Sequence, residues 1–204
     1  RCVPEIIEFS NREFYEPDGI RLEPVRQFAR SNLEPVRTVH VPDASLGDND
    51  VNAAEVEAVV AEIERCIADP AYGGLTFGVV TLLGSGQARA IESELMRRIP
   101  EGEWVRRRLL CGDAHTFQGS ERDVMFVSMV AAPKGRKLVA QTREAVAQRY
   151  NVAATRARDQ LILVHSVLPA ELPNSTDLRF RLLSYCLGVV RSATQPRMLI
   201  DEVV

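Results

Sequence analysis

QRYNVAATRARDQLILVHS, residues 148–166, joins a helical pattern of small apolar residues directly to an apolar strand at 160–166. Such a strand suits a sheet that is buried on both faces. The helical part carries Arg149, Arg156 and Arg158. Arg149 and Arg156 are seven residues apart and therefore lie on nearly one helix face, whereas Arg158 points almost the opposite way. We expect a helix that packs on a sheet and presents guanidinium groups to an anionic ligand. The alternative is that the arginines cap the C-terminus of a helix or pair with surface carboxylates.

Strands and helices alternate along the rest of the chain. We expect strands at 36–41, 75–83, 106–112 and 123–130, and helices at 4–9, 52–70, 87–99 and 177–193. The apolar runs at 75–83 and 123–130 are nearly continuous, which is typical of parallel strands covered on both sides. The sequence therefore predicts an α/β fold with a mainly parallel sheet and helices on both faces.

The helix at 52–70 has the clearest start and stop signals. Asn52 is a plausible N-cap, and Glu55 three residues later resembles the acidic partner of a capping box. Pro70 and the glycine pair at 73–74 end the pattern. The expected apolar stripe consists of Val56, Val59, Val60, Ile63 and Ile67.

Composition excludes several classes of protein. The 204 residues carry a formal net charge of −3, so the chain as a whole gives no basic signal for nucleic acid. The four cysteines lack CxxC spacing and the three histidines lie far apart, which favours reduced thiols and gives no metal-ligand cluster. No apolar run reaches the ~18 residues that span a membrane, and no signal-peptide pattern is present. We expect a cytoplasmic protein, and the start at Arg1 in mid-pattern suggests a fragment of a longer one.

The loop HTFQGSERD, residues 115–123, is unusually polar for a connection between two buried strands. Gly119 allows a backbone conformation that other residues avoid. Glu121 is able to accept from a ribose hydroxyl, while His115 and Thr116 are able to contact a phosphate or a base. The alternative is a polar turn that caps a strand. In open α/β sheets, ligands bind at the carboxyl ends of the strands, where such loops begin.

Taken together, these stretches resemble superfamily 1 helicases of the branch related to the nonsense-mediated-decay RNA helicase. FQGSERDVMFVSMV resembles motif V of that family, and RYNVAATRARDQLILV resembles motif VI at the usual distance. GVVTLLGSGQARAIESEL resembles motif IV, and RCVPEIIEFSNREFY resembles the segment that opens the second RecA-like domain. The resemblance covers about residues 1–168. It implies a RecA-like P-loop NTPase fold and a role in ATP-dependent helicase action.

The resemblance also implies roles for individual residues. Arg1 and Arg156 match arginines that reach the γ-phosphate of the nucleotide from the second domain. Glu121 matches a glutamate near the ribose, and Gln118 and Gly119 match the turn of motif V. We assign Arg149, on the helix face of Arg156, to the same cofactor. Thr81, His115 and Thr116 lie where family members touch the nucleic-acid backbone; where the family has TPY, this chain has TLL, so an aromatic stacking contact there is not expected.

Other segments do not support a complete ATP site. GSGQAR lacks the lysine of a G-x-x-x-x-G-K-[ST] loop, so the domain has no P-loop of its own. RMLIDEVV at 197–204 imitates a Walker B strand, but in this family that strand lies upstream, and a linker is the better interpretation. The three arginines at 106–108 are more simply a solvated strand end than a phosphate site.

We therefore expect residues 1–168 to form the second RecA-like domain of a superfamily 1 helicase, and 169–204 a helical extension and linker. ATP and Mg²⁺ would be bound mainly by a first RecA-like domain, which is one partner; single-stranded DNA or RNA is the other. The resemblance implies 5′-to-3′ translocation, and the isolated fragment should be inactive. The alternatives are a non-catalytic binding module, or the motor of a nuclease or restriction factor.

Overall fold

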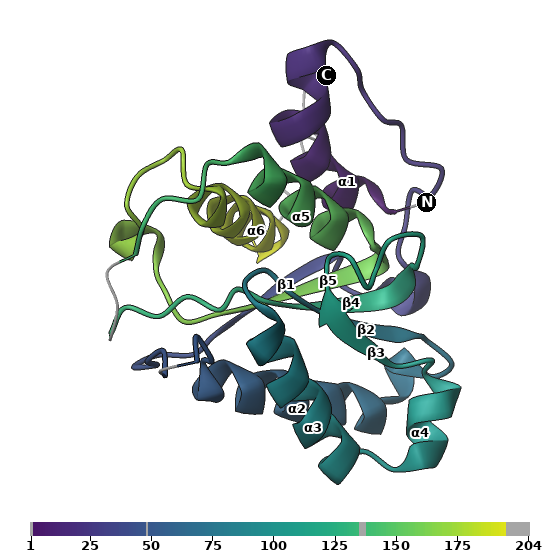
Figure 1. Ribbon diagram of the computed structural model, residues 1–204. Helices are drawn as coiled ribbons and strands as arrows, with labels where there is room; N and C mark the ends of the chain where they lie inside the picture. The colour runs from purple at the N-terminus through teal and green to yellow at the C-terminus, as the bar shows by residue number, and fades with distance from the viewer. Residues whose placement is uncertain (1, 48, 135–137, 195–204) are drawn as a thin grey trace.

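The fold is built on a parallel sheet of five strands in the order β1-β5-β4-β2-β3 (Figure 1). The computed structural model describes residues 2–47, 49–134 and 138–194. The strands are β1 (Val36–His40), β2 (Phe77–Thr81), β3 (Leu110–Asp113), β4 (Arg122–Ser128) and β5 (Ala157–His165). All neighbouring strands pair in parallel. This confirms the predicted α/β class and its parallel sheet.

Helices cover both faces of this sheet, as the sequence predicted (Figure 1). One face carries α2 (Ala53–Ala68), α3 (Ser85–Arg98) and α4 (Glu101–Arg106). The other carries α1 (Pro4–Ser10), α5 (Glu144–Thr155) and α6 (Leu178–Thr194). Among the described residues, no helix combines the length and apolar character needed to cross a membrane.

Side chains alternate between two hydrophobic cores, one on each face of the sheet. In β4, Met125 and Val127 belong to the core under α1, α5 and α6, whereas Val124 and Phe126 belong to the core under α2 and α3. The period of two residues per strand produces this alternation. Because both faces are covered, every residue of β2 is buried, which explains its continuous apolar sequence.

The start of α2 confirms one sequence prediction and corrects another. The Asn52 side chain accepts the backbone N–H of Glu55 at 3.1 Å, so Asn52 is the N-cap. Glu55 does not complete a capping box. Its carboxylate instead accepts from Ser128 Oγ at 2.7 Å and Ser166 Oγ at 3.0 Å, at the carboxyl ends of β4 and β5. In the predicted stripe, Cys66 rather than Ile67 is the fully buried last member.

The helix of residues 148–158 ends earlier than its pattern indicated. α5 stops at Thr155, Arg156 is its C-cap, and β5 begins at Ala157. Arg158 is therefore a strand residue, and the prediction that it projects from the far side of the helix is wrong. At this point, pairing of Ala157 with Arg122 of β4 replaces the hydrogen bonds of the helix, and β5 begins.

The strand expected at 106–112 begins only at Leu110, because residues 101–106 form α4. Arg107 is 4% exposed, so it belongs to neither a solvated strand end nor a phosphate site. Its guanidinium carbon lies 4.9 Å from the centre of the Phe77 ring, and its Nη1 donates to the carbonyl of Tyr72. Arg107 thus joins α4 to β2.

Residues 114–121 cross one face of the sheet, from the carboxyl end of β3 to the amino end of β4, which lies on the far side of β2. Phe117 anchors this crossing segment and is fully buried. It packs against Gly78 of β2, where a Cβ atom would lie only 2.9 Å from the ring and 2.5 Å from Met125 Sδ. Gly78 therefore permits the close approach that holds the segment in place.

Candidate functional site

A cluster of charged side chains lies at the amino ends of β4 and β5. Arg158 Nε donates to Glu121 Oε2 at 3.0 Å, and Arg158 Nη1 lies 3.8 Å from Asp123 Oδ1. The side chains of Arg158 and Glu121 are partly exposed, whereas that of Asp123 is almost fully buried. The pair arises because the register of β4 and β5 brings Glu121 and Arg158 to the same sheet edge. The sequence predicted a role for Glu121 but not its partner.

Arg156 lies at the same edge, at the junction between α5 and β5. Its backbone N–H donates to the carbonyl of Val152 at 3.1 Å, and its carbonyl accepts from Arg122 N–H at 3.0 Å. Among the described residues, its buried Nε has no hydrogen-bond partner, and Nη2 makes only a long contact of 3.4 Å to Thr155. The backbone is thus fixed at both ends while the guanidinium keeps unused donors.

Hydrogen bonds hold the first described residues, Cys2 and Val3, beside this cluster. Cys2 Sγ donates to the carbonyl of Thr155 at 3.3 Å, and Val3 N–H donates to the carbonyl of Arg158 at 3.1 Å. Burial raises the pKa of the Cys2 thiol, so this side chain packs as a neutral group. Arg1, which the sequence analysis assigned to the γ-phosphate, lies outside the described residues.

The crossing segment contains five of the predicted site residues. His115 and Thr116 are exposed near the carboxyl end of β3, where Asp113 accepts from both backbone N–H groups at 3.0 and 3.1 Å. Gln118 and Gly119 follow, also exposed, and Gly119 has a φ of +77°, which requires glycine. Glu121 ends the segment at the opposite sheet edge. The segment therefore links both edges through eight consecutive residues, 114–121.

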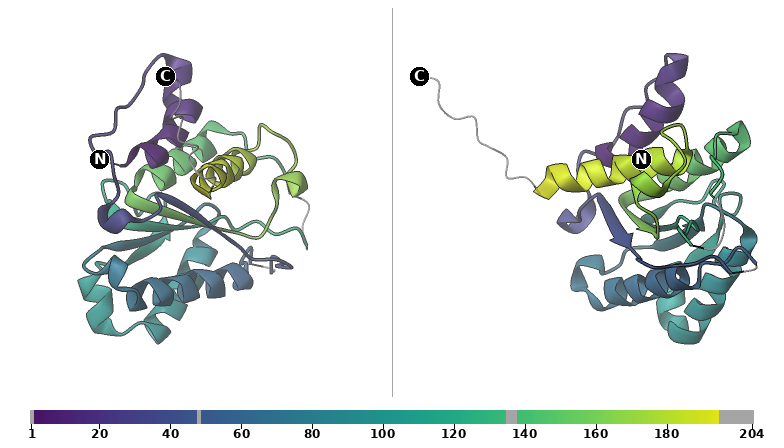
Figure 2. Two further views of the ribbon diagram at one scale, coloured as in Figure 1. Left: turned by 180° about the vertical axis from the view of Figure 1, so that it is seen from behind. Right: turned by 90° about the vertical axis from the view of Figure 1, so that its left-hand side faces the viewer.

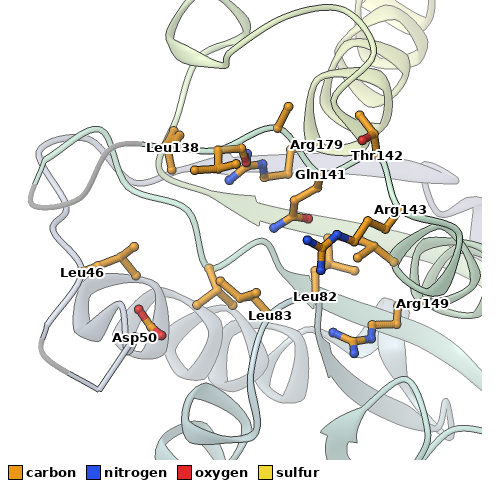
Figure 3. Close-up of a pocket in the computed structure, with 14 residues that line it drawn as sticks. Leu46, Asp50, Leu82, Leu83, Leu138, Gln141, Thr142, Arg143, Arg149 and Arg179 are labelled. Atoms are coloured by element: carbon orange, nitrogen blue, oxygen red, sulfur yellow. The ribbon is translucent and has the colours of Figure 1, made fainter.

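Thr81 and Arg149 lie away from the cluster of Arg156 and Glu121. Thr81 ends β2, is 2% exposed, and its hydroxyl donates to the carbonyl of Gly84 at 3.3 Å. Arg149 is about two helical turns from Arg156, roughly 10 Å along α5. Its side chain lines a cavity at the carboxyl edge of the sheet (Figure 3). The structure therefore does not place Arg149 beside Arg156, although both belong to α5 and its C-cap.

Comparison with protein families agrees with this RecA-like α/β architecture. A family profile described as "AAA domain" matches residues 1–167. The chain belongs to this family, which forms the C-terminal region of superfamily 1 helicases. A solved structure, the C-terminal domain of a possible DNA helicase from Lactobacillus plantarum WCFS1, is similar at 18% identity and a TM-score of 0.48. That similarity covers 81% of this chain and 86% of the other. No curated protein sequence matches the chain.

Proposed function

We propose that the chain acts as the second RecA-like domain of a superfamily 1 helicase. ATP is held chiefly by a first RecA-like domain, and this domain completes the cleft with Arg156, Glu121 and, by resemblance, Arg1. The cycle of hydrolysis opens and closes the cleft and moves the enzyme 5′ to 3′ along single-stranded DNA or RNA. Membership of the helicase C-terminal family supports the proposal.

The observation that carries the proposal is that Arg156 has a fixed backbone and a guanidinium group with unused hydrogen-bond donors. Its backbone is fixed between α5 and β5, yet its Nε is buried without a partner in the described part of the chain. A guanidinium is permanently charged, and its planar fork matches the oxygens of a phosphate. An arginine held rigidly with unused donors at a sheet edge suits a ligand that is supplied from another domain.

The neighbouring residues fit the rest of a nucleotide. ATP, when bound, supplies the phosphoryl group that is transferred to water. Arg156 would stabilise negative charge on that group, and Glu121, oriented by Arg158, would accept from the ribose. Mg²⁺ would be bound chiefly by the first domain, as the resemblance to superfamily 1 helicases implies. Arg149 is left out of this site because its side chain lies at the other sheet edge.

The crossing segment connects the proposed ATP site to the residues that we assign to the nucleic-acid strand. His115 and Thr116 begin it at the carboxyl edge, and Glu121 ends it at the amino edge beside Arg156. Phe117 fixes its middle on β2. A displacement of Glu121 when the cleft closes would therefore be transmitted to the residues that we assign to the nucleic-acid backbone.

The decisive test is the ATPase activity of the helicase that contains this chain, with Arg156→Ala and Arg156→Lys. Arginines in this role contribute on the order of 10³ or more in kcat. We expect such a loss in both variants, because a lysine lacks the planar fork. Arg191→Ala, at an exposed arginine near the end of α6, is the matched control and should retain full activity.

Two outcomes would overturn the proposal. ATPase activity that survives Arg156→Ala, together with retained strand binding, would support a non-catalytic binding module. The isolated chain should show no appreciable ATPase activity with magnesium. Turnover by the isolated chain that Arg156→Ala abolishes would mean that the domain does not depend on a first domain for ATP.

A further inference from the structure

A cavity of about 490 Å³ lies at the carboxyl edge of the sheet, opposite the edge of Arg156 (Figure 3). One wall is apolar and includes Leu82 and Leu83, directly after β2, and Val130, just after β4. Arg143 and Arg149 face this wall from the start and the middle of α5. In Figure 3 both guanidinium groups point toward the leucines, and Asp50 lies at the far end.

Among the residues that the structure describes, no carboxylate pairs with the two arginines. Arg179, which also lines the cavity, is bound by Asp177 at 2.6 Å and donates to the carbonyl of Val139. Within the described ranges, by contrast, neither Arg143 nor Arg149 has an ion pair. The guanidinium groups of Arg143 and Arg149 make this end of the cavity positive, which favours an anionic group there.

The apolar wall contains a strained residue. Val130 has a φ of +58°, which is a true outlier for a β-branched residue. Its N–H donates to Glu55 Oε2 at 2.9 Å, and Ser128 Oγ donates to the same oxygen. Strained residues persist only where the surrounding structure over-determines them, and they cluster at ligand clamps. Here a buried carboxylate fixes the side of the cavity that Val130 forms.

The cavity also continues along the sheet edge. A second hollow, lined by Gly84, Gly86 and Arg89 at the start of α3, shares Asp50 with the first. Thr81, which the sequence analysis assigned to the nucleic-acid backbone, immediately precedes the leucine wall. A chain of linked phosphates would therefore find cationic groups on both sides of that wall.

We propose that this cavity binds one unstacked nucleotide of a single strand, with its base against Leu82, Leu83 and Val130 and its phosphate on Arg143 and Arg149. This inference rests on the proposed function and specifies where the domain contacts the nucleic-acid strand. The volume lies within the range of small-molecule sites, which are mostly apolar with a few placed polar groups. Guanidinium planes also stack on bases that leave the helical stack.

The first experiment measures binding of a fluorescent single-stranded oligothymidylate over a series of salt concentrations. Each phosphate contact contributes about one unit to the dependence of log K on log salt. The double variant Arg143→Ala/Arg149→Ala should bind about tenfold more weakly or worse, with the slope reduced by about one, because the two arginines share one phosphate. Arg191→Ala is the control and should match the unchanged chain in affinity and slope.

The second experiment separates the base from the phosphate. Leu83→Ala should weaken binding of the oligothymidylate several-fold while the salt slope stays unchanged, because no charge is removed. The same variant and the unchanged chain should bind an abasic strand equally, since an abasic strand has no base to place on the wall. Thermal unfolding of each variant confirms that the fold is retained.

The outcomes distinguish this proposal from the proposed function. Strand binding that the double variant leaves unchanged overturns the cavity assignment alone. No strand binding by the unchanged chain overturns both. Displacement of the oligothymidylate by ATP in the unchanged chain, lost in the double variant, would show that the cavity takes a free nucleotide rather than a strand.

Discussion

Glu55 is a single carboxyl group on which several elements depend. Burial raises its pKa from the ordinary 4.5 to about 7, although hydrogen bonds from Ser128, Val130 and Ser166 act in the opposite direction. The folded protein therefore holds this proton more tightly than the unfolded chain does. Between pH 4.5 and about 7 the unfolded state loses the proton first, so stability falls as the pH rises.

We predict that the free energy of unfolding is on the order of 3 kcal/mol lower above pH 7 than below pH 4.5 on account of Glu55. Urea unfolding at a series of pH values measures this difference. Glu55→Gln, which cannot ionise, should remove the decline. Glu57→Gln, on the exposed face of the same helix, should keep it. An unchanged profile in Glu55→Gln would mean that Glu55 does not titrate in this window.

Arg107 is a second residue whose role is structural rather than functional. We predict that Arg107→Met, which keeps the apolar length of the side chain but removes its donors, destabilises the protein by roughly 2 kcal/mol. Arg106→Met removes a charge from a side chain that is 65% exposed and should change stability little. Chemical denaturation of both variants checks the contrast; equal effects would contradict the buried role of Arg107.

At the scale of elements, β2 and the crossing segment depend on Gly78. In Gly78→Ala, the new Cβ would meet Met125, Phe117 and Arg122 at 2.5 to 3.0 Å. We predict a loss of about 1–3 kcal/mol, with the crossing segment displaced. Gly102→Ala in α4 meets no atom within 4 Å and should be neutral or stabilising. Urea midpoints measure both effects, and hydrogen exchange across residues 114–121 should rise only in Gly78→Ala.

The strands were predictable because two covered faces demand continuous apolar sequence, as in β2 and β4. The end of α5 was not, since no glycine or proline separates Thr155 from Ala157, and pairing with Arg122 decides the junction. α4 was missed because six residues are too few to establish a helical period. Local pattern specifies an element's type better than its boundary, which tertiary contacts set.

At the scale of the molecule, the candidate sites were only partly predictable. The polar loop and the arginines of motif VI made Glu121 and Arg156 candidates from local sequence, and the structure places both at the amino edge of the sheet. The partners of Glu55 lie 73 and 111 residues away, and Arg143 has no motif of its own. Their grouping depends on strand order, which brings the ends of β2 and β4 and the start of α5 around one cavity. No pattern along the chain reports such an arrangement.

The position of α6 decides how much of the chain folds as one unit. The family match ends at residue 167, and the sequence predicted a separate extension from 169 onward. Yet α6 packs on β1, α1 and α5, and its buried residues belong to the core of that sheet face. These core residues are Leu178, Leu182, Leu183 and Cys186. In Figure 2, α6 (yellow) lies on the same side of the sheet as α1 (purple).

We predict that a chain ending at residue 168 loses cooperative unfolding and its near-ultraviolet circular dichroism, because one face of the core would be exposed. A milder test keeps the chain length: Leu183→Ala, at a fully buried site, should cost about 2–5 kcal/mol, and Leu187→Ala, at a partly buried site of the same helix, clearly less. A truncated chain that still unfolds cooperatively would show that α6 is a separable extension. In that case the first 168 residues would form the domain by themselves.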